Sequence, residues 1–109
     1  MAISHTAPGQ PVDALPTGSS DSPERTSALF KSKDLEVMRL ILKSGSSLPP
    51  HKVPGEITIH CLAGSISVTA SGATHILRTG QLSFLLGNTV HDVVALEDTV
   101  ALVTVAINK

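Results

Sequence analysis

The chain contains no tryptophan, no tyrosine and only two phenylalanines, Phe30 and Phe84. Proteins that bind single-stranded nucleic acids or sugars commonly stack them on several aromatic side chains. This chain has almost none to offer, so we do not expect recognition by stacking. The absence of tyrosine also excludes that residue as a catalytic acid.

Cysteine is nearly absent too, because Cys61 is the single cysteine. An intramolecular disulfide and a cysteine-pair zinc site are therefore excluded. A lone cysteine is most often a small buried apolar residue.

The charges are few and balanced, with 8 basic and 9 acidic residues and no run of either sign. Nothing in this distribution favours contact with a phosphate backbone, so we expect no nucleic-acid partner. The first ten residues, MAISHTAPGQ, lack the basic flank and apolar stretch of a secretory signal, and no later segment has the roughly 20 apolar residues that cross a membrane. We therefore expect no membrane partner and a cytoplasmic location.

A length of 109 residues with 41% hydrophobic content is enough for one domain. Residues 1–25 are rich in proline, glycine, serine and threonine, and their apolar residues follow no helical or strand period. We interpret them as a flexible leader, with residues 26–109 forming the domain. A tail without function is the simpler interpretation of the leader, and an arm that crosses a partner subunit is the alternative.

From residue 27 onward, short apolar runs alternate with turn residues. The runs are SALFK, DLEVMRLILK, EITIHCLA, SISVTA, THILR, QLSFLL, VHDVVAL and TVALVTVAI, divided by SGSSLPP, AGS, SG, TG, GN and ED. Short strands at such spacing, with no helical pattern between them, indicate an all-β sandwich or barrel of antiparallel strands.

The Ser-Gly pair at 71–72 fits a two-residue hairpin turn. In that register Val68 lies opposite His75, and Ile66 lies opposite Leu77.

The final apolar run, residues 99–107, is hydrophobic on both faces. We expect this strand to be buried on both sides or to lie at a subunit contact. A domain of this size also leaves sheet edges open, so we expect a homodimer, although a fully closed barrel would weaken that argument.

The glycines and histidines of the chain follow a recognisable spacing. Gly45-x5-His51-x-Val53 … Gly64, followed by Gly80-x5-Leu86-x-Asn88-x2-His91, resembles the two-part signature of small single-domain cupins of the RmlC-like type, G-x5-H-x-H-x3–4-E-x6-G and G-x5-P-x-G-x2-H-x3-N. The resemblance covers roughly residues 30–107. It implies a double-stranded β-helix, a jelly-roll barrel of short antiparallel strands.

Carried over position by position, the resemblance implies metal-binding histidines at His51 and His91, and both are present. Val53 occupies the second histidine position, and Ile57 occupies the glutamate position. Two of the four expected ligands are therefore hydrocarbons. The second part of the motif departs from the pattern at Leu86, Asn88 and Ala95.

Strand alternation tests the position of the nearest carboxylate, Glu56, independently of the family. In EITIHCL, the residues on one face are Ile57, Ile59 and Cys61, and those on the other include Glu56 and His60. Because the apolar face should point into the barrel, Glu56 should point outward, unless a bulge at Gly55 rotates it inward. We expect His60 on the outer sheet face or at a dimer contact.

These observations predict an aliphatic ligand pocket lined by His51, Val53, Ile57, Ile59, Cys61, Phe84 and His91. No residue is assigned a catalytic role. A divalent metal ion is a candidate cofactor, with His51 and His91 as ligands and Glu56 and His75 as candidates for further ligands.

Three functions fit this pattern. In the first, the barrel binds a small, fairly apolar molecule, and the two histidines fix its orientation. In the alternative, a metal-dependent enzyme of the dioxygenase or isomerase type uses His51 and His91 as ligands. The third, a metal-free isomerase with a histidine base, lacks an evident partner acid. The replacement of two metal positions by Val and Ile favours the first function.

Overall fold

The computed structural model describes residues 6–16 and 26–107, and these form nine β-strands and no helix. The strands are β1 (Ser27–Lys31), β2 (Leu35–Leu42), β3 (Ser47–His51), β4 (Ile57–Ala63), β5 (Ser65–Ala70), β6 (Ala73–Arg78), β7 (Leu82–Leu85), β8 (His91–Ala95) and β9 (Thr99–Ala106). The predicted all-β class is confirmed. Within these residues no helix is available to span a membrane.

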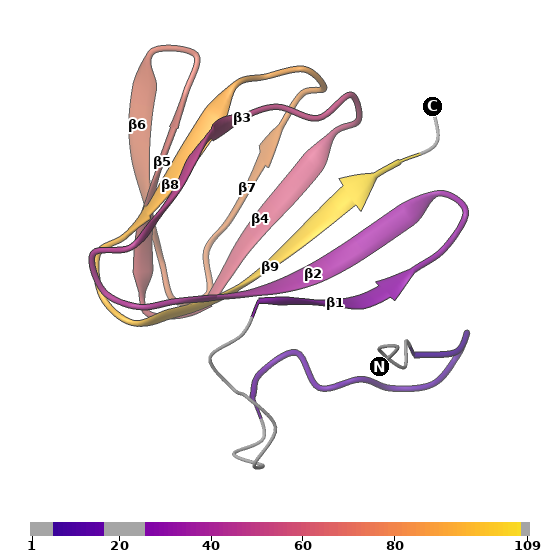
Figure 1. Ribbon diagram of the computed structural model, residues 1–109. Helices are drawn as coiled ribbons and strands as arrows, with labels where there is room; N and C mark the ends of the chain where they lie inside the picture. The colour runs from indigo at the N-terminus through magenta and orange to yellow at the C-terminus, as the bar shows by residue number, and fades with distance from the viewer. Residues whose placement is uncertain (1–5, 17–25, 108–109) are drawn as a thin grey trace.

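The strands form two antiparallel sheets that face each other (Figure 1). The first has five strands in the order β1-β2-β9-β4-β7, and the second has four in the order β3-β8-β5-β6. Neighbours in each sheet are mostly distant in sequence, as in a jelly roll. The two sheets together enclose one core.

The core consists of the inward-facing residues of both sheets. Its buried members are Leu40, Leu42, Ile57, Ile59, Cys61, Ile66, Val68, Leu77, Val93, Ala95, Ala101, Val103 and Val105. Alternate residues are buried along β4 and β9, as the two-residue period of a strand requires. Full burial of each large aliphatic side chain contributes about 1.5–3 kcal/mol.

The hairpin between β5 and β6 has the predicted register. Val68 pairs with His75, and Ile66 pairs with Leu77. The turn residues Ser71 and Gly72 have φ values of 53° and 79°. Both angles are positive, as in the hairpin turns whose twist matches that of the flanking strands.

Of the two alternatives predicted for β9, burial on both faces within one chain is wrong, and a subunit contact stays a prediction. Strand β9 is the central strand of the five-stranded sheet, between β2 and β4, and its residues alternate between buried and half-buried. The facing sheet covers one side of β9. The residues of the other side, Val100, Leu102, Thr104 and Ala106, remain half-buried on the outer face.

Strand β3 is not predicted from the sequence, because most of its residues belong to SGSSLPP, which divides two apolar runs. It contains Pro49 and Pro50, and it lies at the edge of the four-stranded sheet, where a missing N–H leaves no neighbour unpaired. Its pairing with β8 is irregular between Leu48 and His51. The last residue of this edge strand is His51.

Part of the predicted flexible leader lies alongside the barrel, next to β1 (Figure 1). The Thr6 amide donates to the Leu29 carbonyl at 3.3 Å, and Nη1 of Arg39 donates to the Asp13 carbonyl at 3.1 Å. Residues 6–16 therefore contact β1 and β2. The rest of the leader, residues 1–5 and 17–25, lies outside the described residues.

Candidate functional site

A small cavity of about 70 Å³ lies between the two sheets. Its lining residues are Met38, Leu40, Leu48, His51, Val53, Ile57, Ile59, His91, Val93, Val103 and Val105. Apart from the two histidines, every lining residue is aliphatic or methionine. The cavity wall is therefore hydrocarbon except at the two neighbouring imidazole rings.

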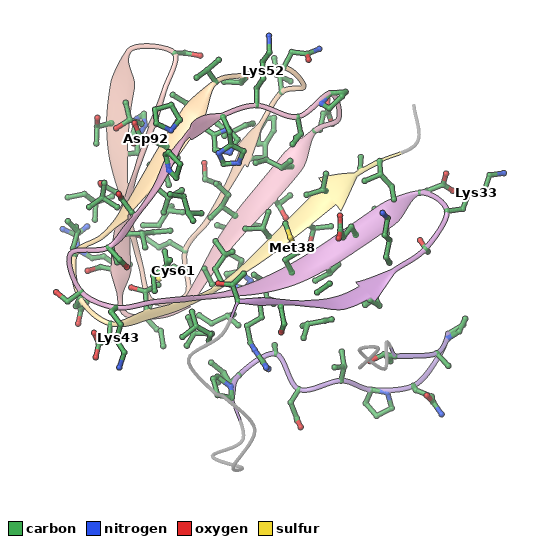
Figure 2. The ribbon with its side chains drawn as sticks, viewed as in Figure 1. Lys33, Met38, Lys43, Lys52, Cys61 and Asp92 are labelled. Atoms are coloured by element: carbon green, nitrogen blue, oxygen red, sulfur yellow. The ribbon has the colours of Figure 1, made fainter. Side chains whose placement is uncertain are left out.

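The cavity lies toward the end of the barrel that carries the β3–β4 loop. Figure 2 shows Met38 pointing into the space between the sheets, Lys52 of this loop pointing outward, and Cys61 nearer the opposite end. A volume of about 70 Å³ is several times the roughly 10–15 Å³ that one water molecule requires in a cavity. It is far below the roughly 300 Å³ of a pocket for a drug-sized ligand. The cavity therefore accommodates a small group only.

The two cavity histidines are direct neighbours across a strand pair. His51 of β3 pairs with His91 of β8, and the ring centroids are 4.3 Å apart with an interplanar angle of 55°. His91 is only 4% exposed, whereas His51 is exposed. One small group can therefore contact both rings from the cavity.

Hydrogen bonds fix the same tautomer in both rings. Nδ1 of His51 lies 3.1 Å from the Pro49 carbonyl oxygen, and Nδ1 of His91 lies 2.9 Å from that of Thr89. Because a carbonyl oxygen only accepts, each neutral ring carries its proton on Nδ1, and Nε2 keeps a free lone pair. Neither Nε2 has a hydrogen-bond partner among residues 6–16 and 26–107.

Glu56 points away from this site. Ile57 and Ile59 are 4% and 1% exposed and line the cavity, whereas Glu56 is exposed and borders an outer groove with Thr58 and Phe84. This is the parity expected from the sequence. The bulge considered at Gly55 does not bring the carboxylate inward.

Gly55 has a different role, which is close packing of the backbone. A Cβ atom at this position would lie 1.7 Å from the carbonyl oxygen of Ala106 in β9. The Ala106 amide also donates to the Glu56 carbonyl at 3.0 Å. This contact fastens the start of β4 to the end of β9 with the Glu56 side chain outside.

The donor set does not fit a resident metal ion. No group of three or more His, Cys, Asp or Glu side chains converges within the described residues, whereas zinc sites use three or four protein ligands. His75 is exposed on β6, and in sheet order β6 is two strands from β8. Two strand spacings are about 10 Å, which is too far for a shared ion.

Two residues that were predicted to line the cavity, Phe84 and Cys61, do not line it. Phe84 is 65% exposed and pairs with Thr58 on the outer face. The prediction for Phe84 was wrong because the more apolar face of QLSFLL, which carries Leu82, Phe84 and Leu86, lies on the outside of the sheet. In the structure Leu85, opposite Ile57, packs against the core instead.

Cys61 points inward but lies deeper in the core than the cavity. It is fully buried, and its thiol donates to the Gly64 carbonyl at 3.4 Å. Burial raises the pKa of the Cys61 thiol, the Glu97 carboxylate raises it further, and a hydrogen bond to the Ala63 backbone opposes the shift. The thiol therefore stays protonated and serves as packing, not as a ligand.

Six residues of the cavity wall are not among those predicted from the sequence, namely Met38, Leu40, Leu48, Val93, Val103 and Val105. Five of them lie on strands β2, β8 and β9, where alternation is visible in the sequence. Pairing of β2 with β9 was the missing information, because it places Met38 opposite Val103 on the inner face.

The loop before His91 packs on the β3–β4 loop. Asn88 stands where the cupin motif has a glycine and has a φ of 62°, in the left-handed region that asparagine tolerates better than most residues. The backbone N–H of Asn88 donates to the Val53 carbonyl at 2.7 Å. A Cβ at Gly87 would lie 2.1 Å from the Pro54 carbonyl oxygen. The two loops that carry the histidine motifs are thus in direct contact.

The barrel, the paired histidines and the motif glycines agree with a comparison of the chain with protein families. The model of the cupin domain matches residues 38–108. The chain therefore belongs to the cupin family.

Solved structures share the same fold. A cupin superfamily protein from Desulfitobacterium hafniense aligns with a TM-score of 0.79 at 14% identity, covering 99% of this chain and 100% of that one. An RmlC-like cupin from Desulfovibrio desulfuricans aligns at 0.75 and 24% identity, covering 89% and 96%. KdgF from Halomonas aligns at 0.71 and 20% identity, covering 84% and 86%. At these identities the likeness extends to the fold alone.

No curated protein matches the chain significantly.

Proposed function

We propose that this cupin binds a small molecule in its aliphatic cavity, with His51 and His91 as the polar groups that orient it. The observation that carries the proposal is the composition of the wall, in which two imidazoles are the only polar side chains among the described lining residues. Pockets with an apolar wall and a few placed polar groups are typical ligand sites. The proposed ligand contacts both rings because they lie 4.3 Å apart.

A metal-dependent enzyme of the dioxygenase or isomerase type is the second candidate. The free Nε2 atoms of His51 and His91 favour it, since neutral imidazole nitrogens bind metals. The hydrocarbon side chains of Val53 and Ile57 in the cavity wall count against it. Elemental analysis of protein purified without an affinity tag, repeated on His51→Ala, separates the two. Stoichiometric metal that disappears in His51→Ala would favour the enzyme.

Filling the cavity with a larger side chain should abolish ligand binding. Val53 is half-buried and lines the cavity, so Val53→Phe places a ring in a space of about 70 Å³. We expect compounds that raise the melting temperature of the wild type in a screen of small organic molecules to have no effect on this variant.

The matched control is Val37→Phe. Val37 is also half-buried but pairs with Thr104 on the outer face. This variant should keep the ligand-induced stabilisation. Equal stabilisation of both variants would place the binding site elsewhere.

We also propose that two copies of the chain pair through the outer face of the five-stranded sheet. Leu82, Phe84 and Leu35 are 61%, 65% and 41% exposed there, next to the half-buried residues of β9. Strands spaced by about 4.8 Å, with up to eight residues each, give a flat sheet area on the order of 500 Å². Side chains that project from the sheet add to this accessible area. Specific interfaces bury about 600–1,000 Å² on each partner, so the proposed dimer covers this whole face together with the side chains that project from it.

A charge on this face should separate the copies. We expect Phe84→Glu to lower the mass measured by light scattering from that of a dimer to that of a monomer, because two carboxylates would be buried at the contact. Ile76→Glu is the control, since Ile76 is 44% exposed on the other sheet. A wild type that is monomeric at high concentration would contradict the proposal.

A further inference from the structure

We infer that the group recognised by the two histidines is a neutral hydroxyl at the end of a short aliphatic chain. This inference rests on the proposed function and specifies its ligand class. It starts from the tautomers, because Nδ1 of both His51 and His91 donates to a backbone carbonyl. Each neutral ring therefore presents Nε2, an acceptor, to a partner.

Two acceptors require a donor from the ligand. An ionised carboxylate, a doubly ionised phosphate ester or a ketone carries acceptor atoms only, so none of them can pair with a bare Nε2. Such a group placed beside both rings would lose its water and gain no hydrogen bond, which is unfavourable. An alcohol hydroxyl or an ammonium group can donate.

The alcohol and the ammonium group differ in charge, and the cavity favours the neutral one. The cavity wall contains no carboxylate among its described residues, and Glu56 borders the outer groove instead. An ammonium group at the cavity would be partly desolvated without a counter-ion, which costs several kcal/mol for an unpaired ion. A neutral hydroxyl donates one hydrogen bond at a far smaller desolvation cost.

The rest of the ligand follows from the wall and the volume. The hydrocarbon wall offers no partner for a second polar group, which excludes polyols from the cavity itself. About 70 Å³ suits a few carbon atoms. With His51 exposed and His91 buried, the hydroxyl lies at the rings and the alkyl chain extends toward Ile59 and Val103.

A series with one alkyl chain and three head groups tests the inference. Propan-1-ol, propanoate and propan-1-amine are titrated into the full chain at pH 8, and dissociation constants are taken from the NMR shifts of methyl groups in the cavity wall. We expect propan-1-ol to bind at least about tenfold more tightly than either ion. Nitrogen-15 spectra of the histidine rings should show protonated Nδ1 and unprotonated Nε2 in the free protein.

Substitution of the histidines supplies the control. His51→Phe and His91→Phe should each reduce the preference for the alcohol over propanoate to less than threefold, since the acceptor is lost while an apolar wall remains. His60→Phe should leave the preference unchanged, because His60 is half-buried on the outer face opposite Leu102. If His91→Phe does not fold, His51→Phe decides the outcome, because His51 is exposed.

The outcomes distinguish the inference from the proposed function. Binding of propanoate or propan-1-amine as tight as that of propan-1-ol, or protonated Nε2 atoms, would overturn the hydroxyl assignment and leave a ligand-binding cavity in place. If none of the three compounds shifts the cavity methyl groups, the inference is overturned, and the proposed function fails with it if the Val53→Phe screen also finds no ligand.

Discussion

Gly64→Ala should lower the free energy of unfolding by about 2–5 kcal/mol. Gly64 lies between β4 and β5 with a φ of 91°, a conformation that costs an alanine about 1–2 kcal/mol. A Cβ there would also lie 2.3 Å from the carbonyl oxygen of Asp98. Backbone atoms cannot move aside as a flexible side chain can, so the clash adds about 1–3 kcal/mol. Urea denaturation measures the sum.

Gly80→Ala separates the two contributions. Gly80 has nearly the same φ, 89°, but nothing lies within 4 Å of its Cβ position. We expect this variant to lose only about 1–2 kcal/mol. Equal losses in the two variants would show that the turn packs less closely against Asp98 than described.

The double variant Val53→His with Ile57→Glu should convert the cavity into a metal site. It restores the ligand types of the cupin motif at the two positions where this chain has hydrocarbons. We expect affinity for a divalent ion to rise by more than the roughly 100-fold that is lost when a group supporting a metal ligand is removed. Ile57 is 4% exposed, so a carboxylate there lowers stability without metal, and added metal should raise the melting temperature strongly.

Val53→His with Thr58→Glu is the matched control. It adds the same two side chains, but Thr58 borders the outer groove next to Ile57 on the same strand. Isothermal titration with zinc should detect tight binding in the first variant only. Tight binding in both would mean that the face of β4 assigned to the cavity is wrong.

Much of the fold follows from local patterns in the sequence. The alternation of SISVTA and the Ser-Gly pair at 71–72 gave the β5–β6 hairpin and its register, because side-chain parity and turn length together fix the pairing. The same parity predicted that Glu56 is outside and Ile57 inside, as the structure has them. These features depend on neighbours in the chain.

The features that the sequence did not reveal depend on residues far apart in it. Strand β3 contains Pro49 and Pro50 and has no alternation, and it forms because β8 lies beside it. The inward side of β7 is set by pairing with β4, which is why Phe84 was misplaced. Patterns within one strand carry none of this information.

Titration of a divalent metal into the wild type and Glu56→Gln tests most directly whether this cavity holds two imidazoles and no carboxylate. Zinc binding measured by calorimetry should be weak and indistinguishable in the two proteins, because the Glu56 side chain borders the outer groove. Tight, stoichiometric binding by the wild type that disappears in Glu56→Gln would contradict the account, since it would place the carboxylate beside His51 and His91.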